Sequence, residues 1–233
     1  MRKLIIDTDT GSDDAVALLM ALRSPEVEVL GITTVGGNVP LEQATQNALM
    51  TVEVCGSRVP VYKGAAKPLF RELVTAVNVH GRDGMGDLGL PPPALRPQRE
   101  HAVDFLIRAI EAEPGELEMV TLGPVTNLAW LSLRSPGTLA KLKRITMMMG
   151  TGPYFGNATP LAEGNARMDP EALDIVLRDA GTELVLVGWD LCINEYLFTE
   201  KDLEGLRQTG SPLAAFCLDI NQDFRLFRVV DVQ

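Results

Sequence analysis

Short apolar runs alternate along the chain with longer segments whose apolar residues recur at helical spacing. The apolar runs predict buried strands at residues 3–7, 27–35, 59–64, 117–123, 144–150 and 183–191. The longer segments predict helices at residues 13–24, 41–56, 101–112, 126–135 and 169–181. Because strands separated by helices of this length need crossover connections, we expect a single α/β domain over residues 1–233. Its sheet should be a mainly parallel, Rossmann-like open sheet flanked by helices.

Two segments, residues 65–100 and 151–168, interrupt this alternation. Long irregular loops in a compact α/β domain usually carry function or move. In an open parallel sheet the binding crevice lies beyond the carboxyl ends of the strands. The polar stretches "DTDTGSDD", "VGGN", "TLGPVTN" and "VGWD" all fall at such predicted ends. The sequence therefore predicts a functional site at this edge of the sheet.

The stretch "IIDTDTGSDDAVALL" places four aspartates between two apolar runs. Asp7 and Asp9 lie two residues apart at a strand end, so both side chains can point to one side. Asp13 and Asp14 begin a helix, where a carboxylate gains from the helix dipole. Two acids would be explained by a helix cap and a solvated loop. Four acids next to core residues, without Cys or His, instead predict a site for a hard cation such as Ca²⁺ or Mg²⁺.

The spacing of the aspartates can be compared with two known acidic motifs. An EF-hand loop needs glycine at its sixth position and glutamate at its twelfth, but counting from Asp7 these are Ser12 and Leu18. The EF-hand is therefore excluded. A haloacid-dehalogenase-type phosphatase has a D-x-D-x-T motif, in which Asp7 would be the nucleophile and Asp9 the acid and base. Its later lysine and Gly-Asp-rich motifs have no convincing counterpart here, and the phosphatase stays as an alternative.

A third interpretation covers more of the chain. "DTDTGSDDAVAL" resembles the N-terminal signature of the inosine-uridine preferring nucleoside hydrolase family, D-T-D-P-G-x-D-D-A-x-A-L, with Thr10 where proline is usual. The resemblance continues in order through "TTVGGN", "LGPVTNLA", "NATPLAEGNARMDPEA" and "VGWDL". It implies an enzyme that hydrolyses the N-glycosidic bond of ribonucleosides to free base and ribose, with Ca²⁺ as cofactor.

The resemblance also implies a role for each matching residue. Asp9 would bind calcium and act as the general base for a calcium-bound water. Asp14 and the backbone carbonyl of Leu122 would be further metal ligands, and Asp7 would support the turn from behind. The residues implied to bind the ribose are Asp13, Asn38, Asn157, Glu163 and Asn165. Carboxylates and amides suit this reaction because its transition state resembles an oxocarbenium ion.

One part of the family pattern is not found. Members carry a late Asp-Pro motif that completes the calcium and ribose shell, whereas "NQDFRLFRVVDVQ" has only Asp231, followed by valine. Loss of a charged ligand predicts weaker calcium binding. Terminal helices that cover one flank are expected to be missing too, which leaves apolar surface exposed or covered by a partner. A truncated chain, an impaired relative that still binds metal and ribose, and an oligomer that supplies the missing part all explain this.

The composition of the chain limits the classes of partner that it can be expected to bind. The formal net charge of −10 argues against nucleic acid or an anionic membrane surface as a partner and leaves a small ribonucleoside as the expected ligand. The three cysteines are isolated, and neither a signal peptide nor a transmembrane run is apparent. We therefore expect a cytoplasmic protein, and a homodimer or homotetramer.

Several other residues were assigned roles from sequence. "GMGDLG" matches G-x-G-x-x-G but lacks the flanking strand and helix of a dinucleotide site, so we expect a mobile flap over the pocket. His80, just before it, is expected to be solvated. Trp189 is expected at the end of a buried strand, and Asn127 is expected to be structural.

Overall fold

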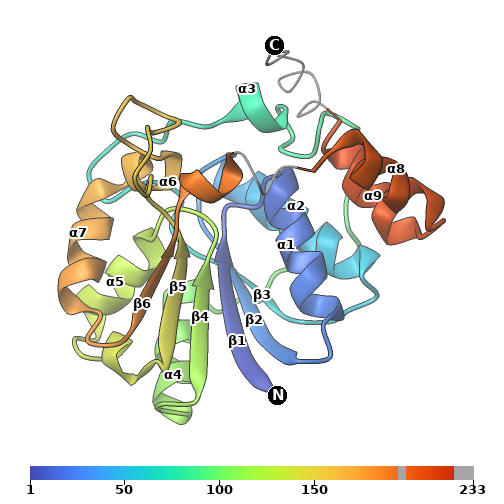
Figure 1. Ribbon diagram of the computed structural model, residues 1–233. Coiled ribbons are helices and arrows are strands. Elements are labelled where there is room, and N and C mark those ends of the chain that lie inside the picture. Colours follow the sequence, from blue (N-terminus) through green and yellow to red (C-terminus); the bar gives the residue numbers. More distant parts are fainter. Residues whose placement is uncertain (194–197, 223–233) are drawn as a thin grey trace.

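Six parallel strands lie side by side in the order β3-β2-β1-β4-β5-β6 in the computed structural model, which describes residues 1–193 and 198–222 (Figure 1). The strands are β1 (Arg2–Thr8), β2 (Val27–Thr34), β3 (Val61–Lys63), β4 (Leu117–Thr121), β5 (Arg144–Met148) and β6 (Leu184–Val187). Every paired neighbour runs parallel. The predicted α/β fold with a parallel open sheet is confirmed. The strand order reverses between β1 and β4, which is where such sheets form their binding crevice.

Helices cover the two faces of the sheet in separate groups. The connecting helices are α1 (Ser12–Arg23), α2 (Leu41–Val54), α4 (Ala102–Ala112), α5 (Thr126–Arg134) and α7 (Pro170–Asp179). The shorter or later elements are α3 (Val77–His80), η1 (Leu139–Lys141), α6 (Gly164–Met168), η2 (Trp189–Cys192), α8 (Glu200–Gln208) and α9 (Pro212–Ile220). Helices α1 and α2 lie over β1–β3 on one face, and α4, α5 and α7 lie on the other (Figure 1).

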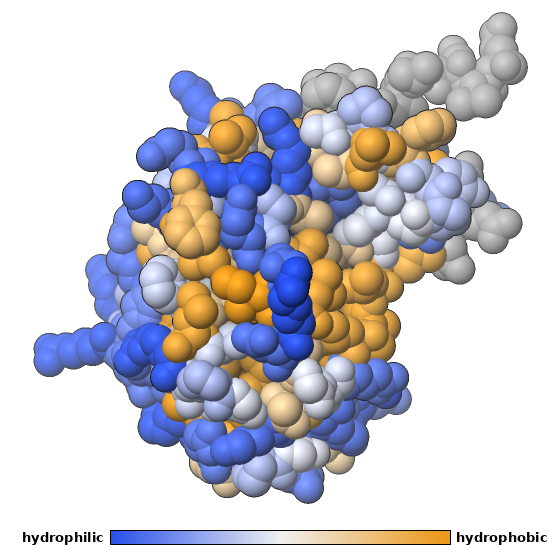
Figure 2. Space-filling model, turned by 90° about the vertical axis from the view of Figure 1, so that its left-hand side faces the viewer, coloured by the Kyte–Doolittle hydropathy of each residue, from blue (hydrophilic) through white to orange (hydrophobic). Residues whose placement is uncertain are grey.

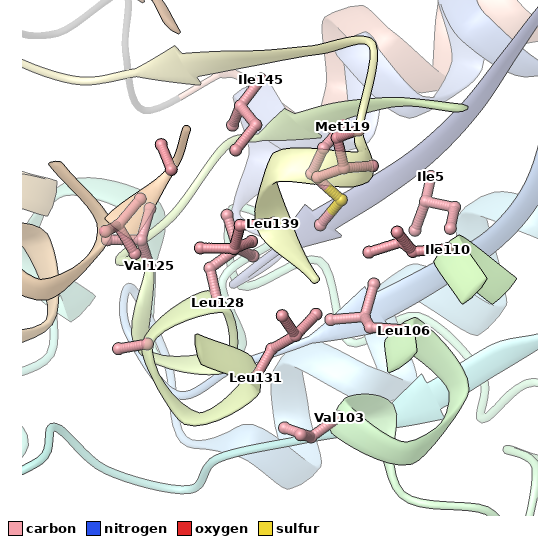
Figure 3. Packing of buried hydrophobic residues seen from close by; sticks show 14 of the residues in the cluster. Ile5, Val103, Leu106, Ile110, Met119, Val125, Leu128, Leu131, Leu139 and Ile145 are labelled. Carbon is pink, nitrogen blue, oxygen red and sulfur yellow. The ribbon is translucent and has the colours of Figure 1, made fainter. Parts of the chain in front are cut away.

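The core follows from the alternation of side chains along β1. Ile5 packs into the cluster built with α4, α5 and α7, whereas Ile6 packs with α1 and α2 on the opposite face. Figure 3 shows Leu106 of α4 and Leu131 of α5 converging on the first cluster. Both faces of β1 are therefore buried, which explains why its sequence is a continuous apolar run.

The sequence placed most elements correctly but overextended the last strand. The predicted strand 183–191 ends at Val187, because the chain turns into the helix η2 at Trp189, whose N–H still donates to the Gly150 carbonyl at 2.8 Å. Trp189 is thus not at a strand end: it lies in η2 and is partly exposed. The irregular segments also contain two short helices, α3 and α6.

One half of the sheet lacks a helical cover among the residues described. On the face that carries α1 and α2, no helix of residues 1–193 and 198–222 lies in front of β5 and β6 (Figure 1). Leu186 of the edge strand β6 is 55% exposed. Figure 2 shows apolar side chains gathered across the middle of the side of the molecule at the left of Figure 1. Apolar surface is therefore exposed in the described part of the chain. No helix within it is long and apolar enough to cross a membrane.

Candidate active site at the carboxyl edge of the sheet

The acidic turn joins β1 to α1 at the reversal point of the sheet. Asp7 belongs to β1, and its neighbours in register are Thr33 of β2 and Thr121 of β4. The turn is held by Thr10, whose backbone N–H donates to Thr8 Oγ1 at 3.1 Å. Proline, usual at this position in the resembled signature, has no N–H and could not form this bond.

Asp9 is fully buried and held on both sides by backbone. Its Oδ2 accepts a hydrogen bond from the backbone N–H of Asn38 at 2.6 Å, while its Oδ1 has no partner. A Cβ atom on Gly37 would lie 2.0 Å from Oδ2, and one on Gly123 would lie 2.4 Å from Oδ1. These two glycines therefore allow the loops after β2 and β4 to close around the Asp9 carboxylate.

Asp14 mirrors this arrangement from the first turn of α1. Its Oδ2 accepts from the backbone N–H of Gly11 at 2.9 Å, and its Oδ1 is buried without a partner. Burial raises the pKa of Asp14 well above its ordinary value, and the charges of Asp13 and Asp9 raise it further. Burial likewise raises the pKa of Asp9, although the hydrogen bond from Asn38 opposes this. Two buried carboxyl groups whose like charges repel, each with an unpaired oxygen, need a cation to stay ionised.

Asp7 precedes this pair in the chain, and the charge of its carboxylate is offset by different hydrogen bonds. Its Oδ1 accepts from Thr33 Oγ1 at 2.5 Å and from Asn127 Nδ2 at 2.7 Å. Burial raises the pKa of Asp7 to about 7, and the two hydrogen bonds act in the opposite direction. Asn127 Oδ1 in turn accepts from the backbone N–H of Ala65 at 2.8 Å, so Asn127 ties Asp7 to the loop after β3. Asp7 is fully buried, which argues against its attacking a substrate as a phosphatase nucleophile.

The donor set fits a hard cation. Asp9 and Asp14 each offer an unpaired oxygen, and the carbonyl of Leu122 follows β4 immediately before Gly123, which contacts Asp9. That carbonyl accepts from Asn165 Nδ2 at 2.8 Å. Within the described ranges, no three His, Cys, Asp or Glu side chains gather as a ready metal cage. The turn thus supplies two carboxylates and a carbonyl, which is part of the oxygen shell that calcium prefers.

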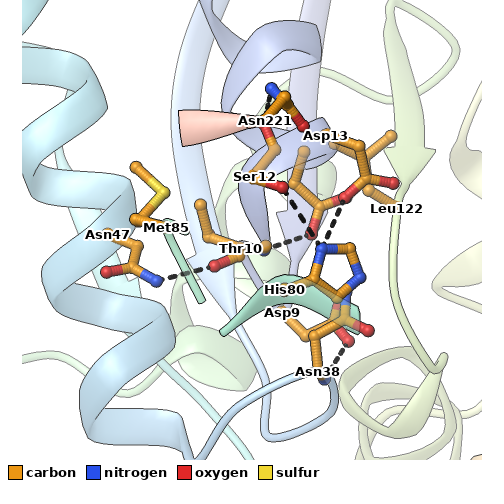
Figure 4. Close-up of polar contacts among 12 residues, drawn as sticks. Asp9, Thr10, Ser12, Asp13, Asn38, Asn47, His80, Met85, Leu122 and Asn221 are labelled. Atoms are coloured by element: carbon orange, nitrogen blue, oxygen red, sulfur yellow. Dashed lines mark hydrogen bonds and ion pairs between the residues drawn. The ribbon is translucent and has the colours of Figure 1, made fainter. Parts of the chain in front are cut away.

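The residues implied to bind ribose fall into two groups. Asp13 and Asn38 converge with His80 around Gly11: a Cβ on Gly11 would lie 3.0 to 3.2 Å from a polar atom of each. Asp13 remains open, with 45% of its side chain exposed. The geometry therefore leaves the Asp13 carboxylate accessible beside two buried carboxylates (Figure 4).

The second group lies around α6. Glu163 caps this helix: Oε1 accepts from the backbone N–H of Asn165 at 2.7 Å, and Oε2 accepts from Ala166 and Gly150. Asn165 donates to the carbonyls of Leu122 and Met148, which leaves only its Oδ1 for a ligand. Asn157 is exposed, and its Oδ1 lies nearest to Gly164. Asn165 thus adjoins the acidic turn through Leu122, whereas Asn157 lies at the rim.

His80 corrects the expectation of a solvated side chain. It is only 7% exposed, and its Nδ1 lies 3.3 Å from Ser12 Oγ and 3.6 Å from Asp13 Oδ1. A lone histidine in a glycine-rich segment gave no sign of this burial, because the contact is made across 68 residues of sequence. Sequence analysis also missed Thr33 and Asn127 as partners of Asp7. Asn127 lies at the start of a helix after β4, and that position was the available signal.

Buried oxygen ligands at the reversal point of a 3-2-1-4-5-6 sheet define an α/β protein with a candidate cation site. The sequence profile of the inosine-uridine preferring nucleoside hydrolases matches residues 4–231. The chain belongs to this family. The family assignment also argues against the phosphatase alternative.

Similar proteins agree with this assignment. Uridine nucleosidase 1 of Arabidopsis thaliana is 44% identical over 204 residues, which are 87% of this chain and 60% of the relative. The inosine-uridine preferring nucleoside hydrolase of Leishmania major is 40% identical over 222 residues, 94% of this chain and 70% of the relative. A solved plant nucleoside hydrolase superimposes with a TM-score of 0.91 at 37% identity, over 97% of this chain and 71% of that one. This chain therefore spans about 60% to 71% of the length of these relatives.

Proposed function

We propose that this chain hydrolyses the N-glycosidic bond of ribonucleosides to free base and ribose. The observation that carries the proposal is the pair of buried carboxylates, Asp9 and Asp14, each with one unpaired oxygen at the carboxyl edge of the sheet. The names of the relatives support the substrate class, because they refer to nucleosides.

Calcium is the cofactor that we propose for this site. Asp9, Asp14 and the carbonyl of Leu122 would hold it, and two carboxylates plus a carbonyl suit calcium better than a softer metal. When bound, calcium lowers the pKa of a neighbouring water. Asp9 then accepts the proton of the attacking water, and the backbone N–H of Asn38 holds its Oδ2 in place while this happens.

The remaining residues bind and orient the sugar. Asp13, Asn38 and Glu163 are proposed to receive the ribose hydroxyls, together with Asn157 and Asn165, and their negative or dipolar groups stabilise positive charge that develops on the sugar. Asp7, held by Thr33 and Asn127, supports the turn from below. We also propose that the chain forms a single domain, and that the protein is cytoplasmic and assembles as a homo-oligomer.

The test measures free ribose released from uridine, inosine, cytidine and adenosine, with and without a chelator. We expect release that the chelator abolishes and added calcium restores. Asp9→Ala should lower kcat by about 100-fold or more with a smaller change in KM, because a general base acts on the water. Asp13→Ala should mainly raise KM. Equal losses in kcat and KM for Asp9→Ala would mean that Asp9 serves only in binding.

A second candidate is a protein that binds metal and ribose with little turnover. It is favoured by the donor count, since no three His, Cys, Asp or Glu side chains among the described residues are grouped so that they could hold a metal ion. Absence of ribose release from every nucleoside at high protein concentration, with calcium binding intact, would select this candidate. Release of phosphate from 4-nitrophenyl phosphate, lost in Asp7→Asn, would contradict both.

A further inference from the structure

A buried amide on α2 links two separate segments of the site. Asn47 is 3% exposed, and its Nδ2 donates to the backbone carbonyl of Thr10 at 2.9 Å and to that of Asp83 at 2.9 Å. Its Oδ1 accepts from Gln43 Nε2 at 3.0 Å. Thr10, which faces Asn47 in Figure 4, belongs to the acidic turn. Asp83 belongs to the glycine-rich loop of residues 81–89. The two N–H groups of the Asn47 amide therefore donate hydrogen bonds to two different segments of the site.

The glycine-rich loop is internally braced rather than open. Asp83 Oδ1 accepts from the backbone N–H groups of Met85 and Asp87, and Asp87 Oδ1 accepts from those of Arg82 and Asp83. Glycines 81, 84, 86 and 89 all adopt positive φ. Asp83 lies at the centre of these hydrogen bonds, so a contact at Asp83 constrains the loop around it.

The same loop is anchored to α1 and α9. Met85 is 2% exposed and packs in a cluster with Ala15 of α1 and Ile220 of α9. A Cβ on Gly84 would lie 2.9 Å from Asn47 Nδ2, which shows how closely the loop approaches the amide. The expectation of a free flap therefore does not describe this arrangement: the loop is docked onto three helices.

Each segment tied by Asn47 carries a different part of the site. The turn carries Asp9 and Asp14, the proposed metal ligands. The loop directly follows His80, whose backbone carbonyl accepts from Gly86 N–H at 3.0 Å and whose ring lies beside Ser12 and Asp13. A shift of the loop against the turn would thus move His80 relative to the Asp13 carboxylate.

We propose that Asn47 is a positioning residue that couples the glycine-rich loop to the acidic turn. Through this amide, in addition to the contacts of Met85 and His80, the position of the loop affects the backbone of Thr10, and the position of the turn affects where the loop holds His80. A buried asparagine needs partners wherever it lies. Here the two N–H groups of Asn47 donate to two different segments, the turn and the loop. No other side-chain amide in the described residues joins these two segments, and a purely local structural role would not require such a link.

The test is hydrogen exchange of backbone amides followed by NMR, without metal or substrate. The reporters are Thr10 and Gly11 in the turn, and Met85 and Asp87 in the loop, because each amide is hydrogen-bonded within its segment. Asn47→Ala and the near-isosteric Asn47→Asp, which lacks both donors, should each accelerate exchange in both segments by about tenfold or more.

The matched control is Thr45→Val on the same helix. Thr45 is buried, and its hydroxyl is hydrogen-bonded to Leu41 and Thr34, neither of which belongs to the loop or the turn. This variant should lower the free energy of unfolding. Beyond that global effect, the exchange rates of the four reporter amides should not change. If Thr45→Val accelerated exchange of the four reporters as much as Asn47→Ala does, the effect of Asn47 would be one of overall stability, and the proposal would be overturned.

The reciprocal variant is Gly84→Ala, which displaces the loop from the opposite side of the same contact. It should accelerate exchange of Thr10 and Gly11 in the native background. In the Asn47→Ala background the acceleration should be smaller, because only the strain of the positive φ and the contact with Val39 remain. Unchanged exchange at Thr10 and Gly11 in Gly84→Ala would overturn the coupling.

A kinetic readout rests on the proposed function. Asn47→Asp should raise KM by about tenfold and lower kcat by less than about threefold, since it moves the sugar-binding side more than Asp9. A fall in kcat with KM unchanged would overturn the proposed direction of the effect. Absence of turnover in the native chain would count against the hydrolase proposal alone, and the exchange result would stand.

Discussion

The two glycines around Asp9 give the sharpest test of the proposed metal centre. Gly123→Ala would place a Cβ atom 2.4 Å from Asp9 Oδ1, the unpaired oxygen that we assign to calcium. Gly123 does not have positive φ, so alanine fits its backbone and the whole effect is steric. An ordinary contact between these atoms is above about 3 Å, so the carboxylate or the loop must move by roughly half an ångström or more.

The structure limits how this clash can be relieved. Asp9 is fully buried, and its other oxygen is held by the Asn38 N–H at 2.6 Å. Overpacking of this kind costs about 1–3 kcal/mol of unfolding free energy. Displacement of a metal ligand by its surroundings lowers metal affinity by about 10- to 100-fold. We therefore expect Gly123→Ala to lose both stability and calcium affinity, and Gly37→Ala, with a Cβ 2.0 Å from Oδ2, to do the same.

Two other glycines separate these effects. Gly31→Ala would place its Cβ 2.5 Å from the Phe105 ring, in the core of the opposite face, so it should lose stability and keep calcium affinity. Gly205→Ala lies on α8 with nothing within 4 Å and should be neutral or gain up to about 1 kcal/mol. Urea unfolding measures the stability, and isothermal titration calorimetry measures calcium binding. If Gly123→Ala bound calcium as tightly as Gly31→Ala does, Asp9 Oδ1 could not be a metal ligand.

Two further predictions concern groups away from the metal ligands. Asn127→Ala should lower the unfolding free energy by about 1–3 kcal/mol, because it leaves Asp7 and the Ala65 N–H with one buried partner fewer, and urea unfolding that matches the native chain would contradict this. The hydrogen bonds and charge of Arg2 hold the pKa of Glu118 below its ordinary 4.5, so this pair stabilises the fold above that pH and ceases to do so as the pH falls below it. The stability difference between the native chain and Glu118→Gln should therefore shrink between pH 6 and pH 3, and a constant difference would contradict the assignment.

The sequence predicted the fold well because the signals for it are local. Alternating apolar runs and helical patterns located all six strands. The predicted boundaries differ from the observed ones by at most two residues except at the end of β6, which was placed four residues too late. The acidic turn was also recognisable, because its four aspartates lie within eight residues. His80 and Asn47 were not recognised as parts of the site. Their contacts with Ser12 and Thr10 span 68 and 37 residues, and such pairings appear only once the chain is folded.

The surroundings of the four aspartates explain why identical side chains in one motif are assigned different tasks. Asp7 has two side-chain donors on one oxygen, so protein groups already offset much of its charge. Asp7, Asp9 and Asp14 each keep one buried oxygen without a hydrogen-bond partner. Asp9 and Asp14, however, have only a single backbone donor each to offset their charge. Asp13 reaches solvent and needs no compensation. A cation therefore gains most between Asp9 and Asp14, because there its charge offsets a desolvation cost that the protein leaves unmet. The assignment of metal binding to these two residues thus follows from their hydrogen bonds as well as from the family motif.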